Sequence, residues 1–172
     1  MTGTDIHIQT LVTERLILRA PRVADFEAYA ATFDSPRAAP MGNLARRDAW
    51  YAFTNDVAGW LLHGFGQWSI DLKDGPHVGE VGLQHPDHFP EPEIGRLLHD
   101  GHQGLGYATE AARAALAWAR DRVPSLVSYI TPDNDSSVAL AARLSAALDP
   151  AALRPDGEGP EETAVYRHWG AA

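Results

Sequence analysis

Hydrophobic residues recur along this chain with two different spacings, and each spacing predicts one kind of secondary structure. Between residues 67 and 72, the apolar side chains Trp68, Ile70 and Leu72 alternate with polar ones, which is the period of a half-buried β-strand. Segments that alternate in this way, or that form short apolar runs, predict strands over residues 15–20, 67–72, 78–83, 93–99, 126–131 and 164–169.

A spacing of three and four residues predicts the helices. Phe26, Tyr29, Ala30 and Phe33 fall at i, i+3, i+4 and i+7, and they therefore lie on one face of a helix. The same spacing predicts helices over residues 46–62, over the alanine-rich segment that follows residue 107, and over residues 135–147. The small side chains of the alanine-rich helix suggest close packing against a sheet. Segments rich in proline, glycine and polar residues predict connections at residues 34–43, 73–76, 85–92 and 149–163.

The order of these elements predicts a mixed α/β fold. The strands over residues 67–72 and 78–83 are joined by the turn Lys73-Asp74-Gly75-Pro76, so they form an antiparallel hairpin. The strand, alanine-rich helix and strand from residue 93 to residue 131 form a right-handed parallel crossover. We therefore expect a twisted, mostly antiparallel sheet with flanking helices and one parallel crossover.

Composition narrows the classes of function. The chain has 172 residues, of which 45% are hydrophobic and 22% charged, as in an ordinary single globular domain. Its net charge of −9 argues against a broad nucleic-acid surface, which needs clustered Lys and Arg. There is no long apolar run and no secretory signal, so we expect no membrane span and a cytoplasmic protein. The absence of cysteine excludes disulfides, thiolate metal sites and a cysteine nucleophile.

A glycine-rich turn leads directly into the alanine-rich helix and is the main candidate for a binding site. Residues 103–110 read QGLGYATE. Glycine permits backbone dihedrals that a Cβ atom forbids, and it leaves room for a ligand to approach. The first turn of a helix presents unpaired N–H groups and the positive end of the helix dipole. The turn is therefore suited to a phosphate or pyrophosphate; the alternative is that it serves only as a tight connection.

Two nucleotide-binding motifs were compared with this turn, and neither fits. In a dinucleotide-binding G-x-G-x-x-G motif, the third glycine would stand at Thr109, and the chain lacks a repeated series of parallel strand–helix–strand units. The G-x-x-x-x-G-K-[ST] motif of nucleotide triphosphatases does not occur in the sequence. Both classes are therefore disfavoured.

Three stretches of the chain resemble the GNAT superfamily of N-acetyltransferases, and most of all its branch of ribosomal-protein N-terminal acetyltransferases and small-molecule relatives (the RimJ/RimL-like branch). Residues 13–29, TERLILRAPRVADFEAY, resemble the first strand and helix of that branch. Residues 93–111, EIGRLLHDGHQGLGYATEA, resemble its central strand and acyl-CoA loop. Residues 134–146, NDSSVALAARLSA, resemble its late helix. The resemblance implies one GNAT domain over residues 1–172.

Individual positions match the motifs of the family. Gln103, Gly106 and Ala108 have the spacing of the acyl-CoA loop, and Asn134 and Ser137 match the start of the late helix. The family resemblance therefore implies an acyltransferase that takes acetyl-CoA as co-substrate and acetylates an amine acceptor, as a monomer or a homodimer.

The resemblance also implies which residues bind the acyl carrier. Backbone N–H groups of the glycine turn would cradle the pyrophosphate of coenzyme A. The strand before the turn would separate from its neighbour and pair with the pantetheine arm through its backbone, because an unpaired strand edge offers free N–H and C=O groups. The carrier-binding residues implied in this way are Leu97, Leu98, His99, Gln103, Gly104, Leu105, Gly106, Tyr107, Ala108 and Asn134.

Direct transfer of an acetyl group to an amine requires a base and an acid. Glu93, at the start of the central strand, is the candidate base, and Glu80 on the neighbouring strand is its rival because the strand register is not fixed by the sequence. Ser137 is the candidate acid that protonates the departing thiolate. The alternatives are an ordinary surface glutamate at position 93 and a helix-starting or solvated serine at position 137; Asn134 is also a good helix cap.

The amine acceptor is set by segments that the sequence describes poorly. We expect it to contact the 34–43 loop, the start of the second helix near Trp50 and Tyr51, and the 85–92 loop, where His85 could line the pocket. A peptide α-amine, an amino acid and a drug-like amine all fit this expectation. His85 and His88 have no further ligand pattern beside them, so no metal is expected.

Two questions follow from the resemblance. The chain could instead be a non-catalytic acyl-CoA-binding or regulatory module on the same fold, which would bind the thioester without releasing thiol. In the family, the late helix ends in Leu-Gly, whereas here Leu144 is followed by Ser145 and Ala146. We therefore expect this helix to end with a different geometry.

Overall fold

The computed structural model describes residues 6–170, apart from the side chains of residues 37, 39 and 40. The single domain predicted over residues 1–172 thus has its first five and last two residues outside this description, and its full extent stays a prediction.

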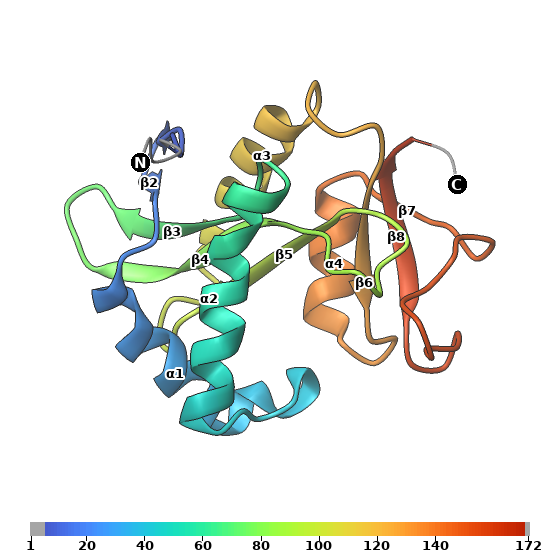
Figure 1. The fold of residues 1–172 in the computed structure, drawn as a ribbon, viewed down its shortest axis with the longest axis horizontal. Coiled ribbons are helices and arrows are strands. Elements are labelled where there is room, and N and C mark those ends of the chain that lie inside the picture. Colours follow the sequence, from blue (N-terminus) through green and yellow to red (C-terminus); the bar gives the residue numbers. More distant parts are fainter. Residues whose placement is uncertain (1–5, 171–172) are drawn as a thin grey trace, which may run out of the picture.

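Within the described residues, eight strands form one sheet in the order β1-β2-β3-β4-β5-β6-β8-β7 (Figure 1). The strands are β1 (Leu11–Val12), β2 (Leu16–Arg19), β3 (Gln67–Leu72), β4 (His77–Gln84), β5 (Glu93–Leu98), β6 (Leu126–Ile130), β7 (Ala147–Leu148) and β8 (Ala164–Trp169). All neighbours run antiparallel except β5 and β6, which are parallel. The predicted mostly antiparallel α/β fold with one parallel crossover is confirmed.

Between residues 6 and 170, four α-helices flank this sheet. They are α1 (Phe26–Asp34), α2 (Arg46–Leu62), α3 (Tyr107–Ala119) and α4 (Asp135–Arg143). A 3-10 helix, η1 (Val23–Asp25), precedes α1, and a second one, η2 (Pro36–Met41), lies between α1 and α2. Figure 1 shows α1 and α2 beside the half of the sheet that holds β3 and β4, and α4 beside β6 and β8.

The small side chains of α3 let this helix lie close to the sheet. Ala111, Ala112, Ala115 and Ala119 have no exposed surface. They share one core with apolar side chains of the strands, among them Leu16, Leu18, Trp68, Ile70, Val81 and Leu83. The close packing expected of this helix is confirmed, and it fixes the start of α3 relative to β4 and β5.

The last two residues of β5 point to opposite faces of the sheet, as alternation in a strand requires. Leu98 belongs to the core under α3, whereas Leu97 packs with Phe26, Tyr29 and Phe53 from α1 and α2. β5 is therefore buried between two helical layers, and it carries side chains to both of them.

The two parallel strands are joined at one end only. Glu93 on β5 is the register partner of Val127 on β6, and the Val127 N–H donates to the Pro92 carbonyl at 3.1 Å. No further register pair between β5 and β6 is found in the described part of the chain. The two strands therefore diverge toward Leu98, as the family resemblance implied.

The expectation for residues 34–43 was wrong, and two short strands were not predicted. The 34–43 segment, predicted as a loop, contains η2, which begins at Pro36; proline is well tolerated in the first turn of a helix. The side-chain amide of Asn43 donates to the carbonyls of Phe33 at 3.0 Å and Ser35 at 2.9 Å, and so closes this segment. The strands β1 and β7 were not predicted, because two residues are too few to show a period.

The helix predicted over residues 135–147 ends earlier, at Arg143. Ser145 takes a left-handed φ of 62°, and its N–H donates to the Ala142 carbonyl at 3.0 Å. The Ala146 N–H donates to the Ala141 carbonyl, also at 3.0 Å. These two bonds form a Schellman cap with serine where glycine is preferred. The chain then turns into β7 instead of continuing the helix.

Candidate functional site

The glycine turn has the conformation that its sequence predicts. Gly104 and Gly106 have φ angles of 74° and 84°, which are left-handed and favour glycine. A Cβ atom built on Gly104 would meet no protein atom within 4 Å, so this residue faces open space. A Cβ atom on Gly106, which precedes the first turn of α3, would lie 3.2 Å from Nη2 of Arg15.

Arg15 holds the turn in place from the other end of the sequence. Its Nε donates to Glu110 Oε2 at 2.7 Å, its Nη1 donates to the Leu105 carbonyl at 2.9 Å, and its guanidinium lies over the Tyr107 ring. On the opposite side, the side-chain amide of Gln103 donates to the Leu98 carbonyl at 3.1 Å and to the His99 carbonyl. The turn is therefore fixed before any ligand binds.

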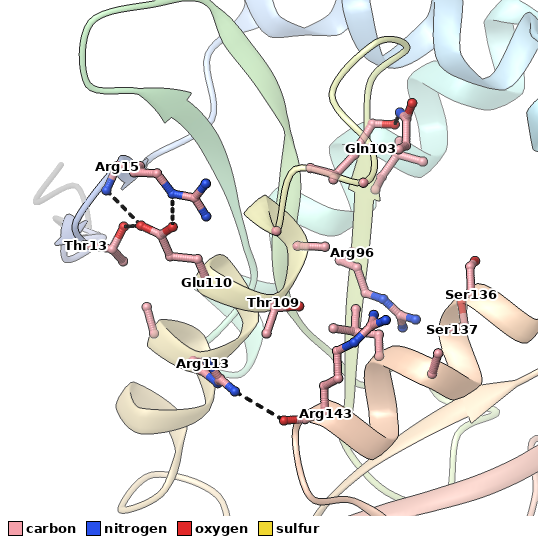
Figure 2. A pocket seen from close by; sticks show the side chains of 18 of the residues that line it. Thr13, Arg15, Arg96, Gln103, Thr109, Glu110, Arg113, Ser136, Ser137 and Arg143 are labelled. Atoms are coloured by element: carbon pink, nitrogen blue, oxygen red, sulfur yellow. Dashed lines mark hydrogen bonds and ion pairs between the residues drawn. The ribbon is translucent and has the colours of Figure 1, made fainter.

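A cavity of about 1290 Å³ lies in front of the turn, between β5, α3 and α4 (Figure 2). Its wall includes the candidate carrier-binding residues Leu97, Leu98, Gln103, Gly104, Gly106 and Ala108. Asn134 and Ser137 line it from α4 and the residue before that helix. The divergence of β5 from β6 thus opens into a cavity that collects residues from three separate segments.

The wall of this carrier cavity carries cationic side chains. Arg15, Arg96, Arg113 and Arg143 line it, and Figure 2 shows Arg96, Arg113 and Arg143 around the space between α3 and α4. Of the two glutamates in the wall, Glu110 is already ion-paired with Arg15. The cavity therefore suits a polyanion, although the chain as a whole is acidic. These arginines were not predicted as a group, because they come from four separate segments of the chain.

Three of the candidate carrier-binding residues do not line this cavity. Leu105 is 51% exposed and contributes its carbonyl to Arg15. The Tyr107 ring stacks under the same arginine. His99 is buried, and its Nδ1 lies 2.9 Å from the Thr32 hydroxyl on α1. Through the Leu105 carbonyl and the Tyr107 ring, two of the three residues contact Arg15, whereas the His99 side chain points toward α1 and β4.

A second cavity of about 490 Å³ adjoins the first on the α1 and α2 side of β5. Both cavities are lined by Arg96, Leu97, Asn134 and Ser137, so they meet at the end of β5 and the start of α4. The second cavity is rich in carboxyl groups, with Asp56, Glu80, Glu93 and Glu158 in its wall. We call it the acidic cavity.

Glu93 lies in the acidic cavity, and so does its rival Glu80. Glu93 pairs with Gln84, and Glu80 pairs with Leu97, so both carboxyl groups point to the same face of the sheet. Burial raises the pKa of Glu93 to about 8, against the opposing influence of the Arg96 charge and a hydrogen bond from Gln84. Such a carboxyl group exchanges a proton close to neutral pH.

Glu80 has a different environment from Glu93. Its side chain is 5% exposed, and its Oε1 lies 3.0 Å from His77 Nε2 and 3.5 Å from His99 Nε2. Two histidines therefore contact the Glu80 carboxyl group, whereas burial is the main cause of the raised pKa of Glu93. This difference favours Glu93 over Glu80 as a proton acceptor.

Asp56 is a further titratable group in this cavity, and the sequence analysis did not propose it. It comes from α2 and accepts a hydrogen bond from the Tyr29 hydroxyl at 3.2 Å. Burial raises the pKa of Asp56 to about 7; the bond from Tyr29 opposes this shift and the charge of Glu80 adds to it. Asp56 lies three positions after Phe53 and directly before Val57, and the sequence spacing alone does not distinguish such a buried carboxyl group from a solvated one.

Asn134 and Ser137 are linked at the start of α4. The Asn134 side-chain oxygen accepts from the Ser137 N–H at 3.1 Å and from the Ser136 hydroxyl at 2.9 Å, so Asn134 caps the helix. Ser137 lines both cavities, whereas Ser136 lines only the carrier cavity.

The segments expected around the acceptor reach the acidic cavity only in part. Met41 and Phe89 line this cavity, but His85, Trp50 and Tyr51 do not.

Comparison with known proteins agrees with this geometry. The family described as Acetyltransferase (GNAT) domain matches residues 15–146. An acetyltransferase from Agrobacterium tumefaciens str. C58 is 42% identical, with 97% of this chain and 98% of that chain covered and a TM-score of 0.87. A putative GnaT-family acetyltransferase from Bordetella pertussis is 25% identical, with coverages of 93% and 98% and a TM-score of 0.75.

The ribosomal L7/L12 α-N-protein acetyltransferase RimL, solved with coenzyme A, shares the fold. It is 16% identical, with coverages of 92% and 95% and a TM-score of 0.67. The chain therefore belongs to the GNAT acetyltransferase family and is an acetyl-CoA-dependent acyltransferase. The predicted family and co-substrate are confirmed, and RimL is among the neighbours in fold. No helix in the described part of the chain is long and apolar enough to cross a membrane.

Proposed function

We propose that this protein transfers the acetyl group of acetyl-CoA directly to a primary amine, without a covalent enzyme intermediate. The observation that carries the proposal is the junction of the two cavities at Leu97 and Ser137, with Glu93 in the wall of the acidic cavity. One cavity is cationic and large enough for a nucleotide-bearing carrier, and the other is acidic and suits an amine.

The carrier would occupy the cationic cavity. Backbone N–H groups of residues 104–108 would bind the pyrophosphate at the start of α3, where the helix dipole favours negative charge. Arg113 and Arg143 would neutralise further phosphate charge. The pantetheine arm would extend along Leu97 and Leu98, toward the junction.

The reaction would take place at this junction. The amine nitrogen attacks the thioester carbonyl, the C–N bond forms and the C–S bond breaks. Glu93 takes the proton that the amine loses, directly or through water, and the Ser137 hydroxyl protonates the departing thiolate before regaining a proton from water. The products are an acetylated amine and free coenzyme A.

The acceptor would enter the acidic cavity. Asp56, Glu80, Glu93 and Glu158 face one cation, Arg96, in its wall, so the cavity attracts an ammonium group. An amine that arrives protonated can lose its proton to a carboxylate whose pKa is raised. Both a protein N-terminus and a small-molecule amine satisfy this description.

The test is release of free thiol from acetyl-CoA with a panel of amines: peptides with free α-amines, amino acids and small aliphatic diamines. We expect thiol release that depends on both the amine and acetyl-CoA, with acetylated amine as the product. The control panel carries the same compounds with blocked amines. Binding of acetyl-CoA without thiol release from any amine would contradict transfer and would favour a binding module.

A further inference from the structure

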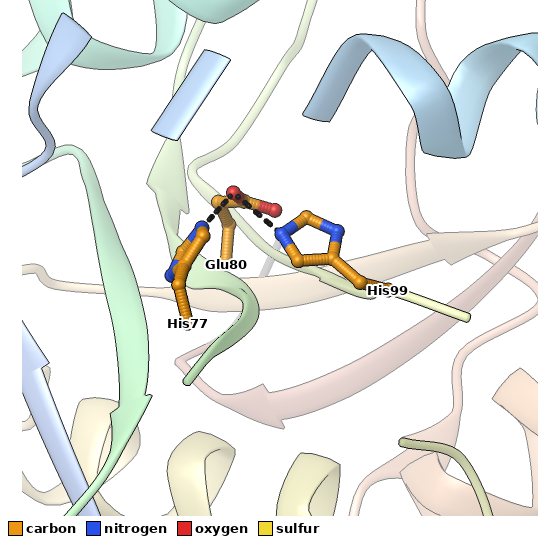
Figure 3. A group of neighbouring side chains, drawn as sticks. All are labelled: His77, Glu80 and His99. Carbon is orange, nitrogen blue, oxygen red and sulfur yellow. Dashed lines mark hydrogen bonds and ion pairs between the residues drawn. The ribbon is translucent and has the colours of Figure 1, made fainter. Parts of the chain in front are cut away.

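Three side chains from two adjacent strand segments form a buried cluster (Figure 3). His77 and Glu80 lie on β4, and His99 directly follows β5. Their side chains are 14%, 5% and 8% exposed. Nε2 of His77 lies 3.0 Å from Glu80 Oε1, and Nε2 of His99 lies 3.5 Å from the same oxygen. The sequence did not predict these three residues as a group, because His99 lies 22 positions after His77.

The outer nitrogen of His77 carries a hydrogen atom. Its Nδ1 lies 3.1 Å from the backbone carbonyl of Ile70 and 3.3 Å from a carboxylate oxygen of Asp71. Both of these oxygens accept hydrogen bonds, so Nδ1 must donate. In the neutral imidazole, Nε2 then presents a lone pair toward Glu80.

The same reasoning applies to His99. The Thr32 hydroxyl lies 2.9 Å from the Ala28 carbonyl, which accepts the single hydroxyl hydrogen. The hydroxyl oxygen therefore accepts from His99 Nδ1, which lies 2.9 Å away. This assignment places the hydrogen on Nδ1 of His99 and leaves a lone pair on its Nε2, again directed toward Glu80.

When both imidazoles are neutral, three lone-pair donors thus converge in a buried place. Glu80 Oε2 and His99 Nε2 have no hydrogen-bond partner within the described residues. Leaving such groups unpaired in the interior is costly. A proton on His77 would satisfy the contact between His77 and Glu80 alone, whereas one cation bound by all three groups would satisfy the whole cluster.

We propose that His77 Nε2, His99 Nε2 and a Glu80 carboxylate oxygen bind one divalent transition-metal ion of the zinc class. Two imidazoles and one carboxylate are a ligand set that Zn²⁺ accepts, with a fourth position left for water. Both histidines are oriented through Nδ1 by a carbonyl or hydroxyl oxygen, which is how metal-bound imidazoles are usually held.

The ion would join parts of the chain that shape both cavities. Glu80 is in the wall of the acidic cavity. The backbone carbonyl of His99 accepts from the side chain of Gln103, which begins the glycine turn. A metal ion at this point would therefore fix the end of β5 and the turn relative to β4. The proposal does not depend on acetyl transfer or on the identity of the acceptor.

The test is metal binding by the full-length protein after treatment with a chelator. Calorimetric titration with Zn²⁺ should give one equivalent per chain, and the bound ion should raise the Tm. His99→Asn and Glu80→Gln should each weaken Zn²⁺ binding at least 100-fold. His85→Asn is the matched control, because His85 lies outside the cluster and should leave binding unchanged. Unchanged Zn²⁺ affinity in both His99→Asn and Glu80→Gln would overturn the proposal.

A second measurement needs no variant and so survives any failure of the variants to fold. ¹⁵N NMR of the histidine rings in the wild-type protein should show two Nε2 signals that shift on addition of one equivalent of Zn²⁺, while both rings keep the hydrogen on Nδ1. Ring signals that do not move at saturating Zn²⁺ would show that the cluster takes no metal.

Discussion

Glu93 on β5 pairs with Val127 on β6, and this is the one register pair that the two parallel strands share within the described residues. Glu93 therefore lies where the strands begin to diverge, and the carrier cavity opens farther along β5 at Leu97 and Leu98. The acidic cavity holds this carboxyl group of raised pKa, and it meets the carrier cavity at Arg96, Leu97, Asn134 and Ser137. The proposed transfer depends on this arrangement.

The first prediction concerns pH. Because a base must be unprotonated to accept a proton, and the pKa of Glu93 is raised to about 8, kcat/KM should rise with pH and level off above about 8. Other charged groups in the same cavity also act on this pKa: Glu158 and Asp56 raise it, whereas Arg96 lowers it. The measurement is a pH profile with an acceptor amine whose own pKa lies well below 7, so that titration of the acceptor does not contribute.

The matching variant is Glu93→Gln, which should lower kcat by about 10²- to 10⁴-fold and remove the rise near pH 8. The Kd of acetyl-CoA should stay the same, because Glu93 lies outside the carrier cavity. Glu161→Gln, an exposed glutamate away from both cavities, is the control. A pH profile that keeps its shape in Glu93→Gln would exclude Glu93 as the base.

The second prediction concerns the glycine turn. Gly104 and Gly101 both have left-handed φ angles, and a Cβ atom on either meets no protein atom within 4 Å, but only Gly104 lines the carrier cavity. Gly104→Val should weaken acetyl-CoA binding by about 100-fold, or about 2.8 kcal/mol. Gly101→Val should lower the free energy of unfolding by about 1–2 kcal/mol, as Gly104→Val does, because each places a side chain on a left-handed residue. Gly101→Val should leave acetyl-CoA binding intact.

Calorimetric titration of both variants makes this comparison. Equal loss of acetyl-CoA affinity in Gly101→Val and Gly104→Val would mean that backbone strain, and not blocked approach of the carrier, explains the effect. Gly106→Val should abolish acetyl-CoA binding, but its side chain would also meet Arg15, so this variant tests the turn less cleanly.

The third prediction separates two neighbouring serines. Ser137 lines both cavities, and Ser136 lines the carrier cavity alone. Ser137→Ala should lower kcat by about 10²-fold, at the lower end for acid catalysis because a thiolate is a good leaving group. Ser136→Ala should have little effect on kcat. Steady-state kinetics with both variants, together with the Kd of acetyl-CoA, would show whether the hydroxyl of Ser137 takes part; equal kcat in wild type and Ser137→Ala would remove it from the mechanism.

The fourth prediction concerns stability. Ser145 has a φ of 62° in the cap that ends α4, and a left-handed residue other than glycine costs about 1 kcal/mol. Ser145→Gly should therefore raise the free energy of unfolding by about 1 kcal/mol and Tm by roughly 2–4 °C. Ser145→Ala, which keeps the Cβ atom, should give no such gain. Urea unfolding of the three proteins checks this, and a less stable Ser145→Gly would contradict the assigned strain.

The sequence predicts the fold well because the core elements carry clear periods. The bounds of α2 and of β3 and β8 match the alternating and helical patterns that predicted them. The glycine turn is also evident, since its φ angles require glycine. In contrast, β1 and β7 have two residues each and carry no period.

The site was only partly predictable because its contacts join distant positions. Arg15 and Glu110 are 95 residues apart, and no local pattern connects them. The sequence could not separate Glu80 from Glu93, because they differ in their surroundings: two histidines lie beside Glu80, whereas burial dominates at Glu93. Asp56 enters the acidic cavity only because α2 packs over that face.

The central claim is that one cavity binds the carrier through the turn and the other presents the amine beside Glu93. A crystal structure with acetyl-CoA and a non-reactive acceptor analogue tests it most directly. The account predicts the pyrophosphate against the N–H groups of residues 104–108, and the thioester carbonyl between Ser137 and the amine, with Glu93 on the side of the amine. A thioester that lies away from Ser137, or a pyrophosphate that binds outside the turn, would contradict it.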